Sequence, residues 1–370
     1  MTSRQRLLTA MQRQQPDRVP IHLRGVQVWS EKWLQSKDES FAPLIEAVRE
    51  VGDWVATWSP GGGPFLTVLE EGQVETQVTD ANDWTLHQTT VPTPRGPLTC
   101  IRQVSKGDYP SLTKKFWVET AEDYERFLSL PYLPPQPEVG SFFALEREMG
   151  ERALVMASFL NPIGYVHALL GSELLALWSI AERSRVQHLI ALFAERVYNL
   201  VEYLLDRGVR GVYGTLGQEY AGPPLLSPRD FHEFVTKPEQ PITQLLHDHG
   251  CLLHVHCHGP MEAILEEFVA LGTDCLHPLE APPMGDITLA EAKRRIGREV
   301  CLEGNIQVGD LYASTPERIR DLTKAALDAA AAGGGFILCP TASPYTRTLP
   351  PRAAQNYLTM IETGLEYGRY

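Results

Sequence analysis

The clearest pattern along the chain is a series of short apolar runs, most of them followed in the second half by a longer stretch with helical spacing. A continuously apolar run of this length is typical of a strand buried on both faces of a parallel sheet. Eight strands are expected, at residues 18–24, 54–59, 153–160, 211–214, within 252–260, at 274–280, 299–305 and 335–340. Helices are expected at residues 3–14, 41–51, 120–129, 185–206, from Ser227 toward Gly250, and at 261–270, 288–295 and 315–331.

This alternation of strands and helices predicts the fold class. Parallel strands need crossover connections, and eight such units close most naturally into a single (β/α)8 TIM barrel, here one domain over residues 1–370. Residues 65–105 depart from the pattern with short alternating runs rich in Val and Thr, which predict an antiparallel β insertion after the second strand. Residues 106–150 are rich in Pro and are expected to form a surface connection. A doubly wound open sheet is the alternative.

One stretch stands out chemically, Leu252 to Pro260, which reads LLHVHCHGP. Side chains two apart on a strand share a face, so His254, His256 and His258 are expected to point the same way. A row of imidazoles at the end of a strand suggests a metal centre or an acid/base centre. The alternative is that one or two of them only hydrogen-bond to neighbouring loops.

Polar residues close the other expected strands as well. The active sites of (β/α)8 barrels lie at the carboxyl ends of the strands, so these residues are candidates for one shared site. A carboxylate, imidazoles and a thiol drawn from different strands are what a mononuclear metal site requires. Each acidic residue taken alone is better explained as a solvated loop carboxylate. The candidates are Arg24, Trp58, Asn161, Gln218, Glu219, Tyr220, His256, His258, Glu280, Glu303, Asn305, Cys339, Thr341 and Ser343.

Composition narrows the class of protein. The 370 residues are 43% hydrophobic and 21% charged, as in an ordinary globular protein. A formal net charge of −13 disfavours binding to nucleic acid or to an anionic membrane surface. We find no window approaching the roughly eighteen apolar residues of a membrane span, and expect a soluble, cytoplasmic protein. The six cysteines show no CxxC pairing and are expected to be reduced.

Several stretches together resemble the uroporphyrinogen decarboxylase superfamily. They are the start, with TSRQRLL and PDRVP, the central segment from Pro224 reading PLLSPRDF, the His stretch, LEGNI from Leu302, and the tail, with GGFIL from Gly334 and EYGRY from Glu366. The resemblance covers nearly the whole chain. It implies a barrel enzyme of a superfamily that includes tetrapyrrole decarboxylases and zinc-dependent methyltransferases acting with methylated corrinoid proteins.

The methyltransferase branch implies a metal site for zinc or another divalent metal. That branch carries His-x-Cys on the fifth strand and a second Cys after the eighth. Here His256 matches and His258 replaces the thiolate, while the third position falls on Ala342 and Cys339 lies three residues earlier. We expect a site rebuilt from His256 and His258 with Glu219 or Cys339. A site that uses His without metal, or an inactive scaffold, is the alternative.

The resemblance to the decarboxylase branch implies a site that binds the carboxylates of the substrate. Its members carry two closely spaced Arg residues and a Gln near the N-terminus, and in Leu23 to Trp29 only Arg24 is kept. One Arg suits a substrate with one carboxylate, smaller than a tetrapyrrole. We expect Glu219, His256 and Arg24 to be catalytic. Substrate-binding residues are expected at Arg24, Trp58, Asn161, Tyr220, Glu280 and Asn305.

These expectations combine into a metal-dependent one-carbon-transfer enzyme, a methyltransferase or demethylase component that acts on a small molecule with a corrinoid-protein partner. A metal-free decarboxylase of uroporphyrinogen or of a smaller acid is the first alternative, with Arg24 anchoring a carboxylate and His256 or His258 supplying a proton. A non-catalytic barrel that binds a partner is the second. A homodimer is compatible with the resemblance.

Overall fold

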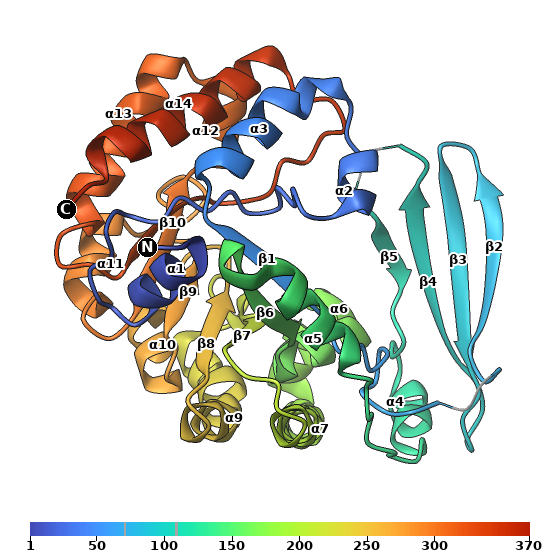
Figure 1. Ribbon diagram of the computed structural model, residues 1–370. Helices are drawn as coiled ribbons and strands as arrows, with labels where there is room; N and C mark the ends of the chain where they lie inside the picture. Colours follow the sequence, from blue (N-terminus) through green and yellow to red (C-terminus); the bar gives the residue numbers. More distant parts are fainter. Residues whose placement is uncertain (70–71, 108–109) are drawn as a thin grey trace.

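The computed structural model describes residues 1–69, 72–107 and 110–370. The protein is a mixed α/β structure built on a curled sheet of seven parallel strands, with a separate antiparallel sheet of four strands (Figure 1). The parallel strands follow one another in sequence order across the sheet. They are β1 (Trp54–Trp58), β6 (Ala153–Leu160), β7 (Val212–Leu216), β8 (Leu252–His256), β9 (Cys275–His277), β10 (Cys301–Ile306) and β11 (Phe336–Pro340).

The N-terminal segment around Ile21 joins the two edges of this sheet. On the β11 side, His22 N donates to Leu338 O, and Leu338 N donates to Pro20 O. On the β1 side, Asp53 N donates to Ile21 O at 2.8 Å. The strand expected at 18–24 is reduced to isolated bridges, because Pro20 has no N–H to continue a ladder. The arrangement is consistent with a TIM-like fold.

The helices lie around the outside of the parallel strands (Figure 1). They are α1 (Ser3–Met11), α2 (Glu31–Gln35), α3 (Ala42–Val51), α4 (Ala121–Leu128), α5 (Gly140–Met149), α6 (Pro162–Ala181), α7 (Arg183–Asp206), α8 (Pro228–Phe231), α9 (Lys237–Asp248), α10 (Leu265–Leu271), α11 (Leu289–Ile296), α12 (Val308–Ala313), α13 (Pro316–Ala330) and α14 (Pro351–Tyr367). Helix α1 differs from the others, because its Leu7 and Met11 pack against residues at the amino ends of the parallel strands, such as Val55 and Val212. Apolar side chains therefore fill the amino ends of the strands, and the polar side chains lie toward the carboxyl ends.

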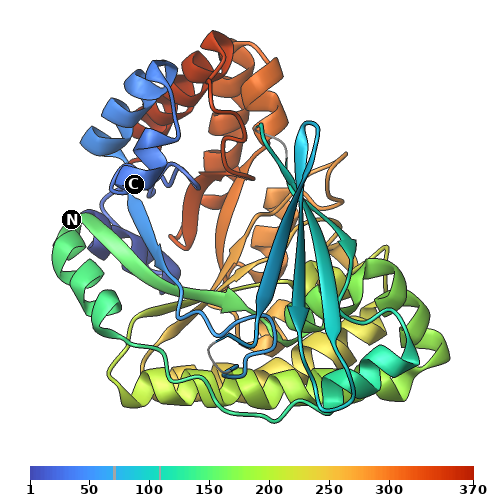
Figure 2. The ribbon, with the colours of Figure 1, turned by 90° about the vertical axis from the view of Figure 1, so that its right-hand side faces the viewer.

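The antiparallel sheet lies between β1 and β6 in the sequence. It consists of β2 (Glu75–Ala81), β3 (Trp84–Val91), β4 (Leu98–Ser105) and β5 (Leu112–Lys115). It stands to one side of the parallel sheet, with β2 as its outer edge (Figures 1 and 2). The β insertion expected at 65–105 thus begins and ends about ten residues later in the sequence, because Phe65 and Leu66 are fully buried in a turn.

Helix α6 was not expected from the sequence. Its 20 residues have a hydropathy of 1.4, so by length and composition it is apolar enough to cross a membrane. The expectation that no such window exists was therefore wrong. Burial explains the composition, because 56% of the window lies inside the protein and the helix packs against α7. Gly171 kinks the helix, with φ +74°, beside the ring of Phe116.

Candidate functional site

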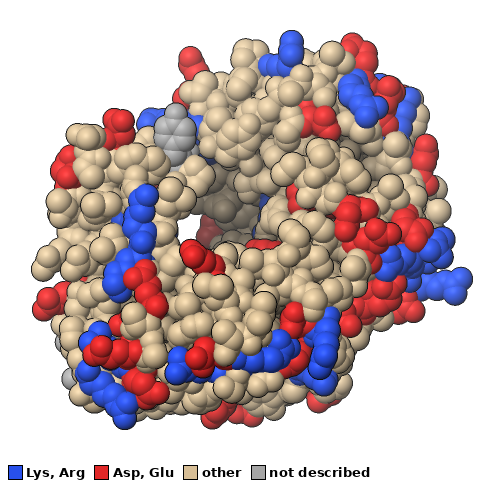
Figure 3. Space-filling view, turned by 180° about the vertical axis from the view of Figure 1, so that it is seen from behind, with Lys and Arg blue, Asp and Glu red and all other residues tan. Residues whose placement is uncertain are grey.

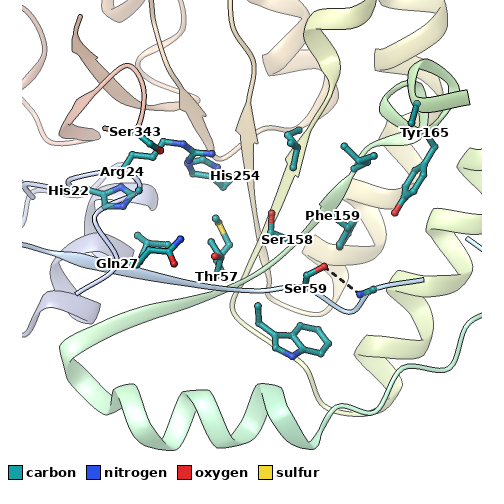
Figure 4. Close-up of a pocket in the computed structure, with 18 of the residues that line it drawn as sticks. His22, Arg24, Gln27, Thr57, Ser59, Ser158, Phe159, Tyr165, His254 and Ser343 are labelled. Carbon is teal, nitrogen blue, oxygen red and sulfur yellow. Dashed lines mark hydrogen bonds between the residues drawn. The ribbon is translucent and has the colours of Figure 1, made fainter. Parts of the chain in front are cut away.

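A cavity of about 620 Å³ lies inside the curl of the parallel sheet. Its two ends differ in chemistry. His22, Arg24, His254 and Ser343 gather at one end, and Phe159 and Tyr165 lie toward the other (Figure 4). Seen from behind, the molecule is hollowed at its centre, with charged side chains visible inside the hollow (Figure 3). The volume suits a small molecule with an apolar part and a polar part.

Arg24 is the one lysine or arginine among the described residues that line this cavity. The described part of the chain places no carboxylate in the lining and no hydrogen-bond or ion-pair partner on the Arg24 guanidinium. Gln27 lines the cavity from the same segment, and Trp58 from the end of β1. Of the residues expected from the sequence, Arg24, Trp58 and Ser343 are therefore the ones that line this space. An unpaired guanidinium at a polar end favours an anionic ligand group.

Beneath the polar end, the buried carboxylate of Glu303 on β10 contacts two imidazoles. Its Oε1 lies 2.5 Å from His22 Nδ1, and its Oε2 lies 2.7 Å from His254 Nε2. Two thiols are close by. Cys339 Sγ lies 3.9 Å from His22 Nδ1, and Cys275 Sγ lies 3.8 Å from Glu303 Oε2. All five side chains are buried, and they come from four strands and the N-terminal segment. We call these five residues, His22, His254, Cys275, Glu303 and Cys339, the buried layer.

Burial and neighbouring charge act on these groups in opposite directions. Burial works to raise the pKa of Glu303, but the charge and hydrogen bond of His22 and the hydrogen bond of His254 hold that pKa well below its usual range. Burial raises the pKa of the Cys339 and Cys275 thiols well above their usual value, and the carboxylate of Glu303 adds to the effect. Without a metal, the arrangement is one ionised carboxylate between two imidazoles and two neutral thiols.

Two groups of buried side chains have the donor atoms of a metal site. One is His22, Glu303 and Cys339, and the other is His254, Cys275 and Glu303. Within each group the ligand atoms lie within 4.8 Å of one another. Nitrogen, sulfur and carboxylate oxygen are the donors that zinc takes, so both groups fit such an ion.

The imidazoles expected at the metal site lie elsewhere. His256 Nδ1 faces His277 Nδ1 at 2.8 Å, and His258 Nδ1 faces Glu280 Oε2 at 3.1 Å. Burial lowers the pKa of His256, and Arg24 lowers it further. The rings of His256 and His258 lie edge to face, with centroids 4.7 Å apart. Neither ring belongs to either of the two metal-binding groups found in the described residues.

The expected carboxylates, Glu219 and Glu280, lie near His258. Glu280 Oε2 accepts from Gly259 N at 3.0 Å as well as facing His258. Burial works to raise the pKa of Glu280, yet these two hydrogen bonds leave it lowered. Burial raises the pKa of Glu219, whose Oε2 accepts from Gly217 N at 3.2 Å. The structure therefore keeps two carboxylates near His258 without joining all four expected ligands in one group.

Three of the expected substrate-binding residues lie outside the cavity lining and have contacts of their own. Asn161 is fully buried, where it caps α6 by accepting from Gly164 N and donates to Glu239. The Tyr220 ring stacks on the ring of His167. Asn305 lies on β10 beside Cys339 of β11.

Sequence reasoning overlooked three residues of the buried layer as site residues. His22 and Cys275 were not among the expected site residues, and His254 was noted only as part of the His stretch. The sequence did contain one signal for His254. It lies two residues before His256 on the same strand, so both side chains are expected to point to the inside of the curled sheet. The partner on β10, Glu303, is 49 residues away from His254, and its contact with that ring is not visible in any local pattern.

Comparison with known proteins places the chain among relatives. The family model described as uroporphyrinogen decarboxylase (URO-D) matches residues 101–359. Among solved structures, a methyltransferase from Methanosarcina mazei is similar, with a TM-score of 0.63 and 15% sequence identity, over 99% of this chain and 99% of that chain. At that identity the likeness concerns the fold. No curated protein matches the sequence.

Proposed function

The chain belongs to the uroporphyrinogen decarboxylase family, and from that premise we propose that it is a metal-dependent enzyme of one-carbon transfer. It would serve as a methyltransferase or as the demethylase component of such a system. The observation that carries the proposal is the buried layer of imidazole, carboxylate and thiol at the polar end of the cavity. An apolar cavity above a set of metal donors suits a small methylated substrate.

We assign the metal to His22, Glu303 and Cys339, whose ligand atoms lie within 4.8 Å of one another. This differs from the expected set, in which His256 and His258 were joined by Glu219 or Cys339. The reason is geometric, because the Nδ1 atoms of His256 and His258 are turned toward His277 and Glu280. A zinc ion bound there would supply a Lewis acid for the atom that carries the methyl group.

The cavity side chains would hold the substrate for this step. Arg24 binds an anionic group, and the apolar end around Phe159 holds the carbon skeleton. In the transfer the bond between the methyl carbon and its heteroatom breaks, and the bonding pair stays on the heteroatom, which takes a proton. A reduced corrinoid, if a partner protein carried one, would supply the electron pair for the new bond to carbon. The proton comes from solvent. Burial and the charge of Arg24 lower the pKa of His256, so this ring is neutral and can act as a general base rather than as the proton donor.

We further propose that the whole chain is one (β/α)8 barrel, with the segment at 18–24 as the strand that completes it. Its hydrogen bonds to Leu338 on one side and to Asp53 on the other support this count. The antiparallel sheet is then an insertion after the second strand. A barrel of this kind presents the carboxyl ends of its strands to the substrate.

Metal-free decarboxylation is the second candidate. Arg24 supports it, because its guanidinium can hold a carboxylate. An imidazole, His256 or His258, would return a proton to the carbon that loses carbon dioxide. Uroporphyrinogen carries many carboxylates, whereas the described cavity lining offers one lysine or arginine side chain. A smaller acid with one carboxylate suits this cavity better.

The decisive experiment measures metal and activity on the same preparation. We expect purified, dialysed protein to retain at least about one equivalent of metal, and a Glu303→Gln variant to lose it. Glu299→Gln, at an exposed position just before β10, serves as the matched control and should retain the metal. Methyl transfer from methoxylated acids to a reduced corrinoid should stop when a chelator removes the metal. Release of carbon dioxide that persists in chelator would favour the second candidate instead.

A further inference from the structure

The two metal-binding groups share one residue through different atoms. Glu303 meets His22 through Oε1 and His254 through Oε2. Each oxygen also has its own thiol nearby, Cys339 on the His22 side and Cys275 on the His254 side. The carboxylate thus stands between two similar sets of donors, each with one nitrogen, one sulfur and one oxygen.

The buried carboxylate of Glu303 is a favourable ligand for a cation. Glu303 has 1% of its surface exposed, and its two oxygens meet the rings of His22 and His254. In the described part of the chain no lysine or arginine forms a salt bridge with it. Buried carboxylates are ordinarily paired with a cation or bound to a metal.

The spacing of the donors decides between one ion and two. A zinc ion lies roughly 2.0–2.3 Å from nitrogen and sulfur ligands, so two ligands of the same ion lie no more than about 4.4 Å apart. The groups found among the described residues keep His22 with Cys339 and His254 with Cys275, and neither contains both imidazoles. One ion therefore cannot use both sets without movement of the strands.

We propose that Glu303 bridges two divalent metal ions of the zinc type. One ion is held by His22 Nδ1, Cys339 and Glu303 Oε1, and the other by His254 Nε2, Cys275 and Glu303 Oε2. The inference rests on the proposed function for the first ion and adds the second. On binding, each thiol releases its proton to solvent, and each neutral imidazole moves its proton to its other ring nitrogen. Two protons leave for each pair of ions.

The surroundings agree with this assignment. Both imidazoles line the cavity, so the ions lie where a bound substrate can reach them. Two ions bridged by a carboxylate typically lie about 3.5–4 Å apart and can act together on one substrate group.

The test counts the ions in the wild-type protein. Metal-free protein is titrated with Co²⁺, and the absorption of cobalt–thiolate bonds is followed. We expect it to saturate at two equivalents, with loss of the electron paramagnetic resonance signal as neighbouring ions couple. Saturation at one equivalent overturns the bridged pair and leaves the proposed function standing. No tight binding at all overturns both, so the two failures are distinguishable.

Variants then assign each ion to its set. Cys339→Ala and Cys275→Ala should each retain one equivalent, and Glu303→Gln should retain less than about 0.2. Cys251→Ala, a buried thiol outside both groups, should retain two. Circular dichroism checks that each variant is folded, and anomalous diffraction from cobalt-loaded wild-type crystals gives the same count without any variant. A single anomalous peak, or two equivalents retained in Cys275→Ala, would refute the pair.

Discussion

His256 and His277 place their Nδ1 atoms 2.8 Å apart, so one of these two rings donates an N–H hydrogen bond to the other. The second nitrogen of His277, Nε2, lies 3.0 Å from the carbonyl oxygen of Pro340, which can only accept. Burial, with Arg24, holds the pKa of His277 well below its usual value, so the ring is neutral. His277 therefore carries its proton on Nε2, and His256 donates through Nδ1. His256 is left with a lone pair on Nε2.

The first prediction follows from this tautomer. In protein labelled with ¹⁵N-histidine, magnetic resonance should report an unprotonated Nε2 on His256, and a His277→Phe variant should show a mixture of the two tautomers. We expect the variant to lose roughly 10- to 100-fold in kcat/KM, as when a group that orients a functional histidine is removed. His249→Phe, at an exposed ring bonded to the Leu245 carbonyl, is the control and should leave both readouts unchanged. A protonated Nε2 on wild-type His256 would contradict this assignment of the protons.

The second prediction concerns Arg24 as the anion-binding residue. A hydrogen bond to a charged group contributes about 1.5–3 kcal/mol, so Arg24→Gln should raise KM for a methoxylated benzoate roughly 10- to 100-fold. Arg24→Lys should recover only part of this, since an ammonium cannot bind a carboxylate bidentately. Calorimetry with the benzoate gives a readout independent of turnover. Arg102→Gln, at an exposed position of β4, is the control. If KM stays constant in Arg24→Gln while kcat falls, Arg24 does not bind the anion.

The sequence predicted the alternation of parallel strands well, because their apolar runs are local and short. The observed β6 coincides with the expected strand at 153–160. Strand β9 ends three residues early, at His277, since Pro278 cannot donate to a ladder. Helix α6 escaped notice because it is buried on most of its surface and lacks the polar face that gives a helix its period.

The site was harder to predict, for a reason visible in three residues. Alternation on β8 puts the His254 and His256 side chains on the same face of the sheet. It does not say which residues of the neighbouring strands each ring meets. The neighbours of each ring depend on the register between β8 and the adjacent strands. The register with β9 places His256 opposite His277. His258 lies beyond the end of β8, where alternation no longer applies. Contacts between residues as distant as His22 and Glu303 arise only when the sheet curls.

The third prediction tests the kink of α6. Gly171 has φ +74° and ψ 169°, a region that essentially only glycine occupies, and a Cβ there would lie 2.5 Å from the Phe116 ring. Gly171→Ala should therefore destabilise the protein by about 1–3 kcal/mol from backbone strain, and by more if the ring must move. Gly309→Ala, on α12, should be neutral or slightly stabilising, because a Cβ added at that position would have nothing within 4 Å of it. Urea denaturation of both variants checks this, and an unchanged midpoint in Gly171→Ala would contradict it.

The fourth prediction comes from Glu239, a fully enclosed carboxyl of α9 that accepts from Asn161 and Gln218. Burial raises its pKa to about 8, from the ordinary value of 4.5 that it has in the unfolded chain. Between those values the folded state binds one proton more than the unfolded state, so this group makes stability fall by about 1.4 kcal/mol for each unit of rising pH. Glu239→Gln should remove that slope, measured as the free energy of unfolding in urea from about pH 5 to pH 8. The exposed Glu202→Gln on α7 should keep the wild-type slope, and parallel curves for wild type and Glu239→Gln would show that Glu239 is ionised throughout.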